Sequence, residues 1–268
     1  MVFDFMKMKI GIVGLGFVGN AIHKSLDDML CVTIDLDPSK GCSGTYQDLM
    51  DADAVFVCVP SPSNADGSCD SSILESVLEN LKDYKGVIIS KVTATPDVYD
   101  RLSSQYHNLV YVPEFLTAAN AVNDYQQTRY FIIGGSNKVY QREAERILRS
   151  SHPDAFTVFA DIKSASLTKY ITNSFLATKV VFMNEMAELS ANLDLDWITV
   201  ARLVRLDNRI GESHMQVPGP DGLKGFGGMC FPKDTSALLQ HAEQMNASLH
   251  VLKESVKKNT LLRLTKPK

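Results

Sequence analysis

Residues 8–19 have the sequence MKIGIVGLGFVG, in which a short apolar run leads directly into a glycine-rich turn. Residues 20–30 have a pattern typical of a helix, so strand, turn and helix occur in the order of a dinucleotide-binding unit. There the first glycine permits the tight turn, the second lets a pyrophosphate approach, and the third lets the helix pack on the strand, while the helix N-terminus attracts the anion. A plain glycine-rich turn is the alternative. The residues predicted to bind the cofactor are Gly14, Gly16, Phe17, Val18 and Gly19.

A carboxylate follows the next predicted strand. Residues 31–34 form a short apolar run that ends at Asp35, where a carboxylate would hydrogen-bond the adenine ribose. Asp35 and the nearby Asp37 would repel a 2′-phosphate, so the sequence favours NAD over NADP. Lys40, in the same loop, is also predicted to bind the cofactor. The alternative is an ordinary surface acid after a strand.

Strand-like and helix-like segments alternate through the first half of the chain. Apolar runs recur at 54–59, 86–90, 109–112 and 130–133, separated by segments of helical length. This alternation predicts a Rossmann-type doubly wound α/β fold, with a parallel sheet and helices on both faces. Ligands of such sheets bind beyond the carboxyl ends of the strands. The candidate loops, each of which could also be an ordinary turn, are 60–62, 91–93 and 113–116.

The second half is predicted to be helical. Residues 161–192 contain no Gly or Pro, which indicates one long central helix of about 30 residues, about 45 Å in length. Its apolar residues occupy more than one stripe, so we expect it to pack against the sheet domain and against a second subunit of a homodimer. The predicted domains are an NAD-binding Rossmann domain at 1–160 and a small all-helical substrate and dimerisation domain at 161–268.

Two polar residues share one face of this helix. Lys169 and Asn173 are four residues apart. A buried lysine there could exchange protons, and the amide could donate a hydrogen bond to an oxyanion. The alternative is a solvent-facing polar pair.

The most specific local pattern is GFGGMCFPKD at 225–234. Pro232 suits the start of a helix, predicted at 235–245, and this leaves Cys230 just ahead of the helix N-terminus. That placement, with Lys233 nearby, favours the thiolate and predicts a nucleophile. A buried inert cysteine is the alternative. The remaining cysteines lack such a setting and are predicted core or loop residues: Cys31, Cys42, Cys58 and Cys69.

The composition excludes several classes of protein. The formal net charge of −4 gives no electrostatic basis for binding nucleic acid or an anionic membrane. Five cysteines without paired spacing argue against a disulfide framework and a structural zinc site, and they fit a reducing cytosol. Residues 1–8 lack the apolar run of a signal peptide, and no stretch approaches the ~20 apolar residues that cross a bilayer. We expect a soluble cytoplasmic protein without a metal, ending in a basic, solvated helix end at 253–268.

Seven segments, in order along nearly the whole chain, resemble the UDP-glucose/GDP-mannose dehydrogenase family. They are 14–19, 59–62 with Asp66, Gly67 and Asp70, 91–93, 113–116, 169–173, 209–211 and 225–234. The resemblance implies that Cys230 is the nucleophile and that Lys169, Asn173 and Asp234 surround it. Glu114 and Thr93 would assist the water and proton steps.

The resemblance also implies the remaining binding residues. For NAD it adds Pro60, Ser61, Thr93 and Lys233. Arg209 is expected to reach the substrate, from the same or the partner subunit. The full substrate set is Glu114, Phe115, Leu116, Thr117, Lys169, Asn173, Arg209, Gly225, Phe226 and Gly227.

The implied reaction is a four-electron oxidation of a nucleotide sugar, with UDP-glucose to UDP-glucuronate as the first choice. Two NAD molecules act in succession while Cys230 carries a thiohemiacetal and then a thioester. Family members usually continue for another small domain, so we expect a short form without the C-terminal UDP-binding domain. Ala118 and residues 94–96 also depart from the family pattern, and we expect Arg209 and the loop 214–228 to carry more of the substrate binding.

Two alternative functions remain open. A β-hydroxyacid or 6-phosphogluconate-type dehydrogenase shares the glycine turn and the Lys-x-x-x-Asn helix, but it needs no cysteine. A non-catalytic NAD-binding module shares the fold alone.

Overall fold

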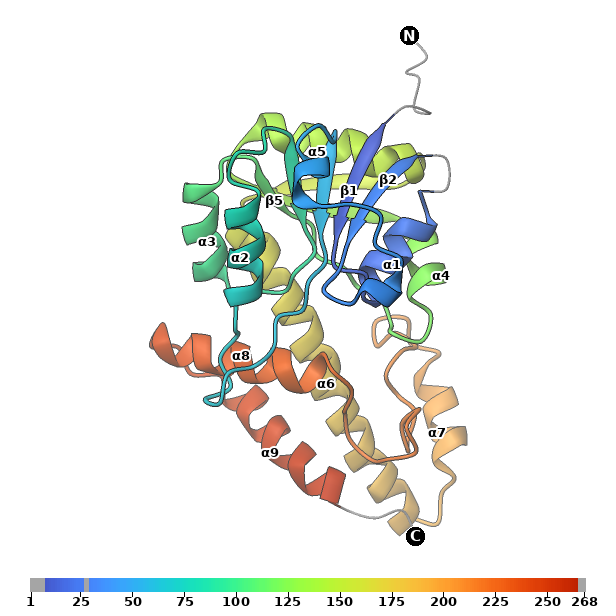
Figure 1. Cartoon of the computed structure of the whole chain (residues 1–268). Helices are drawn as coiled ribbons and strands as arrows, with labels where there is room; N and C mark the ends of the chain where they lie inside the picture. The colour runs from blue at the N-terminus through green and yellow to red at the C-terminus, as the bar shows by residue number, and fades with distance from the viewer. Residues whose placement is uncertain (1–7, 27–28, 265–268) are drawn as a thin grey trace. The chain divides into compact units, whose positions relative to one another are not determined.

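The structure is a computed structural model, and it describes residues 8–26 and 29–264. The predictions for residues 1–7 and for the last part of the basic tail, 265–268, lie outside the described residues. The chain divides into two compact units (Figure 1). The first unit comprises Met1–Pro62 and Cys69–Lys169, and the second comprises Ser63–Ser68 and Tyr170–Lys268.

The first unit is built on a seven-stranded sheet with the order β2-β1-β3-β4-β5-β6-β7. All neighbouring strands pair in parallel except β5 and β6, which are antiparallel. The Rossmann-type α/β fold predicted from the sequence is thereby confirmed, although the sheet is mostly rather than wholly parallel. The strands are β1 (Lys9–Val13), β2 (Leu30–Ile34), β3 (Ala54–Val57), β4 (Val87–Ser90), β5 (Leu109–Tyr111), β6 (Tyr130–Gly135) and β7 (Phe156–Ala160).

The strand β7 is missing from the sequence prediction. It lies at one edge of the sheet, and its burial alternates instead of forming a buried apolar run. Phe156 and Val158 are 61% and 47% exposed, so this strand lacks the continuous burial that marks the central strands.

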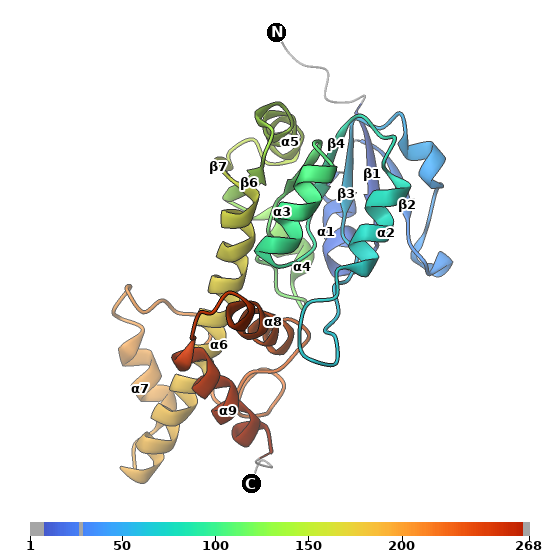
Figure 2. The same cartoon turned by 90° about the vertical axis from the view of Figure 1, so that its left-hand side faces the viewer.

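Helices cover both faces of the sheet (Figure 2). One face carries α1 (Phe17–Lys24), α4 (Ala121–Gln126) and α5 (Lys138–Ser151), and the other carries α2 (Ser72–Asn80) and α3 (Pro96–Gln105) with the first turn of α6 (Ile162–Asn192). Short 3-10 turns, η2 (Pro38–Lys40) and η3 (Tyr46–Leu49), connect β2 to β3.

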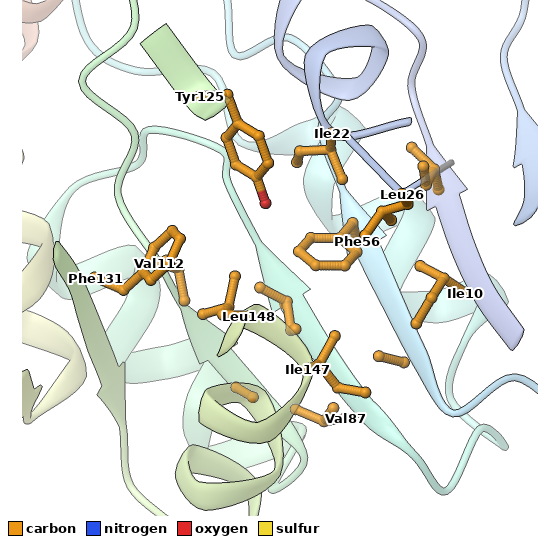
Figure 3. Packing of buried hydrophobic residues seen from close by; sticks show 14 of the residues in the cluster. Ile10, Ile22, Leu26, Phe56, Val87, Val112, Tyr125, Phe131, Ile147 and Leu148 are labelled. Carbon is orange, nitrogen blue, oxygen red and sulfur yellow. The ribbon is translucent and has the colours of Figure 1, made fainter. Parts of the chain in front are cut away.

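Branched and aromatic side chains fill the first of these interfaces (Figure 3). Ile10, Phe56 and Val87 of the strands are buried with Ile22 of α1 and Ile147 of α5. Full burial of each such side chain stabilises the fold by roughly 1.5–3 kcal/mol. This core fixes the strands whose carboxyl ends carry the candidate site.

The predicted helices 20–30 and 235–245 both begin too late. Helix α1 starts at Phe17 and ends at Lys24, and α8 (Phe231–Gln244) starts directly after Cys230. In each case the glycine or cysteine at the turn is itself the N-cap residue, so the helix includes residues that were assigned to the turn.

The second unit contains the rest of α6, with α7 (Trp197–Val204), α8 and α9 (His250–Leu264) (Figure 1). The predicted long helix is confirmed, since α6 has 31 residues. Two small clusters hold the unit together, one around Ala177, Val181, Phe226 and Leu262 and one around Met183, Ala201 and Met215. The prediction of a solvated helix near the C-terminus is confirmed in part: Lys253 and Lys257 of α9 are exposed, but the helix also buries Leu252, Asn259 and Leu262.

One apolar face of α6 stays exposed in the single chain. Its members are Leu167, Ile171, Phe175, Phe182 and Leu189. Within the described part of the chain, no helix is both long and apolar enough to span a membrane.

Candidate active site

The glycine turn between β1 and α1 brings backbone segments into close contact and leaves one side of the turn open. Gly14 has φ +94°, and its N–H donates to the Ile34 carbonyl at 2.8 Å, which joins the turn to β2. A Cβ on Gly19 would lie 1.9 Å from the Gly14 oxygen, so only glycine fits there. A Cβ on Gly16 would meet nothing within 4 Å, so its backbone is open to a ligand. Because no side chain caps α1 at Gly16, this end of the helix suits a pyrophosphate.

The other predicted cofactor residues follow neighbouring strands. Phe17 and Val18 are half-buried in the first turn of α1. Pro60 and Ser61 follow β3, which pairs in parallel with β1, so they lie beyond the same edge of the sheet as the glycine turn. Pro60 is exposed and Ser61 is buried. Ligands of doubly wound sheets bind beyond this edge, where Pro60 and Ser61 lie.

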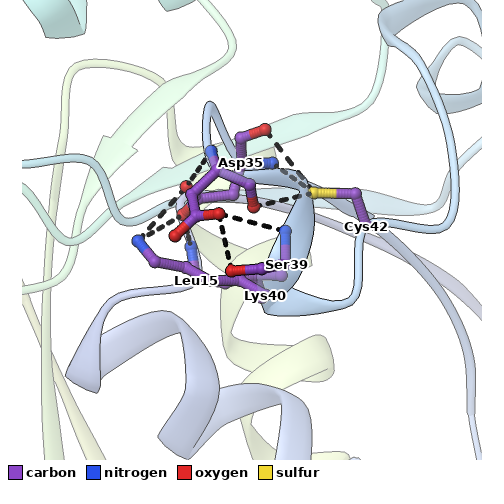
Figure 4. A network of polar contacts seen from close by, with 6 residues as sticks. Leu15, Asp35, Ser39, Lys40 and Cys42 are labelled. Carbon is purple, nitrogen blue, oxygen red and sulfur yellow. Dashed lines mark hydrogen bonds and ion pairs between the residues drawn. The ribbon is translucent and has the colours of Figure 1, made fainter.

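Asp35 is the centre of a polar network after β2 (Figure 4). Its Oδ2 accepts from the Leu15 N–H at 2.6 Å, and its Oδ1 accepts from the Asp37 N–H at 2.9 Å. The Lys40 ammonium lies 3.2 Å and 3.3 Å from the two oxygens. Partial burial acts to raise the pKa of Asp35, but the backbone hydrogen bonds and Lys40 outweigh it and lower the pKa. Asp35 is therefore held as a carboxylate beside the glycine turn.

Cys42, predicted only as a core or loop residue, closes this loop. The Cys42 Sγ accepts from the Asp35 N–H at 3.1 Å and lies 3.5 Å from the Asp35 carbonyl oxygen, to which the thiol donates (Figure 4). All five cysteines lie among the described residues, and none forms a disulfide.

Glu114 and Lys169 form a buried pair in the first unit. The Lys169 ammonium donates to the Glu114 carbonyl and lies 3.2 Å from Oε1 of its carboxylate. It also lies 5.2 Å from the centre of the Phe115 ring. The alternative of a solvent-facing Lys169–Asn173 pair is wrong, because both side chains are buried.

The loop after β5 is held by its own side chains. The second carboxylate oxygen of Glu114 accepts from the Leu116 N–H at 2.7 Å. Thr117 is exposed, and its N–H and hydroxyl both donate to Asp124. Thr93, after β4, is half-buried, and its carbonyl accepts from the Cys69 thiol at 3.5 Å.

Lys91 is a buried cation for which the sequence predicts no role. It is 5% exposed, and its ammonium lies 6.0 Å and 5.9 Å from the ring centres of Tyr125 and Phe131. Burial lowers the pKa of Lys91 from 10.5 to about 8, although Cys58 and Glu114 act in the opposite direction. Residues 91–93 were predicted as a candidate ligand loop, but the sequence does not indicate that the Lys91 side chain is buried.

Cys230 and Asp234 lie in the second unit, one helical turn apart. Cys230 is half-buried at the N-cap of α8, and its carbonyl accepts from the Asp234 N–H at 2.8 Å. The Asp234 side chain is 1% exposed. Its Oδ2 accepts from the Asn173 amide at 2.5 Å, and its Oδ1 accepts from the Lys233 ammonium at 2.6 Å. A carboxylate is thereby fixed beside the first turn of the helix that Cys230 begins.

The predicted substrate residues of the second unit differ in exposure. Gly225 and Phe226 are buried, Gly227 is partly exposed, and Arg209 is exposed. The Arg209 guanidinium pairs with Asp207, with 2.9 Å between Nε and Oδ1. Among the described residues, no group of three or more His, Cys, Asp or Glu side chains is placed to hold a metal ion.

The sequence matches models of two domains of one family. Residues 40–152 match the NAD binding domain of the UDP-glucose/GDP-mannose dehydrogenase family, and residues 163–260 match its central domain. The chain belongs to this family. The resemblance stated from the sequence and the predicted NAD cofactor are both confirmed by these matches.

Individual relatives agree with this assignment. The chain is 32% identical over 248 residues to the UDP-glucose 6-dehydrogenase of Rickettsia felis, which covers 87% of this chain and 53% of the relative. It is 30% identical over 290 residues to the putative UDP-glucose 6-dehydrogenase YtcA of Bacillus subtilis. This match covers 92% of this chain and 66% of the relative. The chain thus spans about half to two thirds of the length of these family members.

A solved structure supports the fold. The UDP-glucose dehydrogenase from Pyrobaculum islandicum matches with a TM-score of 0.82 at 24% identity, covering 97% of this chain and 70% of the other. At this level of identity the match confirms the Rossmann-type fold with its helical continuation.

Proposed function

We propose that this chain catalyses the NAD-dependent four-electron oxidation of a nucleotide sugar, UDP-glucose to UDP-glucuronate, with Cys230 as covalent nucleophile. The observation that carries the proposal is the position of Cys230 at the N-cap of α8, one turn ahead of a buried Asp234 that Asn173 and Lys233 hold in place. Relatives named UDP-glucose 6-dehydrogenase support the choice of sugar nucleotide.

The N-terminus of α8, at which Cys230 is the N-cap residue, favours the thiolate of Cys230. The glycine turn at Gly14, Gly16 and Gly19 would hold NAD, which when bound would supply the hydride acceptor for both oxidations. The thiolate attacks the C6 aldehyde left by the first oxidation, a C–S bond forms, and the oxygen takes a proton to give a thiohemiacetal. Loss of a second hydride and of that proton gives the thioester. Covalent capture therefore retains the aldehyde and presents it for the second oxidation.

Water must then break the C–S bond to yield the carboxylate and return the thiol. Glu114 is the proposed base, and its buried carboxylate is held in place by the Lys169 ammonium, 3.2 Å from Oε1. Lys169 and Asn173 lie one turn apart on the continuous helix α6, and both are proposed donors to the oxygen that gains negative charge. Thr93 is proposed to assist the proton steps.

The test is to count NADH per sugar consumed in wild type, Cys230→Ser and the control Cys31→Ser. We expect two NADH per sugar for wild type and for Cys31→Ser. Cys230→Ser should lose uronate formation by orders of magnitude, on the order of the 10³–10⁶ typical of nucleophile loss, while NAD binding survives. One NADH per substrate would indicate a hydroxyacid-type dehydrogenase, and none in wild type would indicate a binding module.

A homodimer through α6 is part of the proposal. A face of this helix about 30 Å long carries Ile171, Phe175, Phe182 and Leu189, all exposed, which a second copy would cover. The five cysteines outside disulfides support a reducing compartment, the cytoplasm.

A further inference from the structure

A buried amide on α9 holds the loop that leads to Cys230. Asn259 is buried, and its Oδ1 accepts from the Phe226 N–H at 2.7 Å. Its Nδ2 donates to the Phe226 carbonyl at 3.0 Å. One side chain therefore satisfies both polar groups of a buried backbone residue, in the manner of a neighbouring strand.

A second buried amide holds the preceding residue. The Asn184 Oδ1, on α6, accepts from the Gly225 N–H at 3.2 Å. Asn184 is itself fixed, because its Nδ2 donates to the Val180 carbonyl at 2.8 Å. Two successive backbone N–H groups of the loop are thus bound by side chains from two different helices.

Packing also holds Phe226, and Gly227 lies against the Arg263 guanidinium, from which a Cβ there would be 2.5 Å away. The Phe226 ring is buried against Ala177, Val181 and Leu262. At Gly228 the backbone has φ +75°, and a Cβ there would meet nothing within 4 Å. Met229 is exposed, and Cys230 follows. The loop therefore consists of a fixed part at 225–226 and an open turn at Gly228 directly before the cysteine.

We propose that Asn259 is a positioning residue for Cys230. The inference rests on the proposed nucleophilic role of that thiol. The amide fixes the Phe226 backbone, and this fixed point limits how far the open turn at Gly228 can displace the sulfur. Without the amide, the Phe226 N–H and carbonyl would be buried and unpaired, so the loop would move toward water to satisfy them.

The test compares Asn259→Ala with Thr260→Ala, an exposed neighbour on the same helix. Both changes raise intrinsic helix propensity, so a loss confined to Asn259→Ala is not due to melting of α9. We expect hydrogen exchange of the Phe226 amide to become about tenfold faster in Asn259→Ala, the factor expected for one lost buried hydrogen-bond partner. We also expect kcat to fall about tenfold while KM for NAD stays within about twofold. Thr260→Ala should match wild type.

A second variant keeps the proposal testable if Asn259→Ala does not fold. Asn259→Asp retains the acceptor for the Phe226 N–H but loses the donor to the Phe226 carbonyl. In this variant the exchange rate of the Phe226 amide should lie between the rates in wild type and in Asn259→Ala. Exchange equal to wild type in the folded variants, or a KM change without a kcat change, overturns the proposal. Wild-type turnover in Cys230→Ser would instead refute the nucleophilic role of Cys230. Because Asn259 is intact in that variant, this result is distinct from a failure of the positioning role.

Discussion

Replacing Lys91 by Met should stabilise the protein at neutral pH. The Lys91 ammonium is buried near the rings of Tyr125 and Phe131, and burial lowers its pKa from 10.5 to about 8. In the unfolded chain the same ammonium is hydrated. Since one pKa unit corresponds to about 1.4 kcal/mol, the charge opposes folding by about 3 kcal/mol. Met fills a similar volume without a charge, so the variant should gain about that amount.

The gain should depend on pH in a defined direction. Below pH 8 both folded and unfolded proteins keep the proton, and the penalty is fully present. Between pH 8 and 10.5 the unfolded chain binds more protons than the folded one, so wild-type stability from this group rises with pH. We therefore expect the advantage of Lys91→Met to shrink from about 3 kcal/mol at pH 7 to about 1.4 kcal/mol at pH 9.5.

Urea unfolding followed by far-UV circular dichroism at both pH values would measure this difference. The control is Lys85→Met, an exposed lysine of the same unit, which should change stability by no more than about 0.5 kcal/mol. A Lys91→Met protein that is less stable than wild type at pH 7 would refute the reasoning. So would a stability difference that is the same at both pH values.

Three further changes test other parts of the structure. Asp35→Ser removes the acid that pairs with Lys40, so titrations with NADH and NADPH should show the preference moving toward NADPH by about tenfold, or 1.4 kcal/mol. Gly19→Ala places a methyl against the Gly14 oxygen, so thermal unfolding should show a loss of about 2 kcal/mol or more, with weaker NADH binding. Phe175→Asp puts a charge on the exposed face of α6, where Phe175 is 66% exposed, so light scattering should report monomers if this face joins two subunits.

The fold was predictable wherever a local pattern determines the backbone. The glycine turn requires Gly19, because a side chain would overlap Gly14, and that constraint appears directly in the spacing of the glycines. The long helix α6 follows from a stretch without Gly or Pro. The edge strand β7 and the reversed pairing of β6 depend on neighbours distant in sequence, so no local pattern indicates them.

In the candidate site, too, the residues within local motifs were predictable and a residue that acts from a distant segment was not. Glu114, Lys169, Asn173 and Asp234 were all chosen from their motifs, and the structure buries all four and pairs Glu114 with Lys169 and Asn173 with Asp234. Their catalytic roles stay predictions. Asn259 could not be found, because an asparagine in a basic amphipathic segment gives no sign that it binds a loop more than thirty residues earlier.

Both oxygens of the Asp35 carboxylate already interact with the Lys40 ammonium of the same chain. A ribose diol that binds there must share the oxygens with the Lys40 ammonium or displace it. Occupancy by the cofactor and the conformation of the 35–42 segment are then thermodynamically linked, and the linkage is reciprocal. Where the diol displaces the ammonium, a change that weakens the Lys40–Asp35 pair will strengthen dinucleotide binding, and saturating dinucleotide will in turn release Lys40 and speed tryptic cleavage of the peptide bond after it.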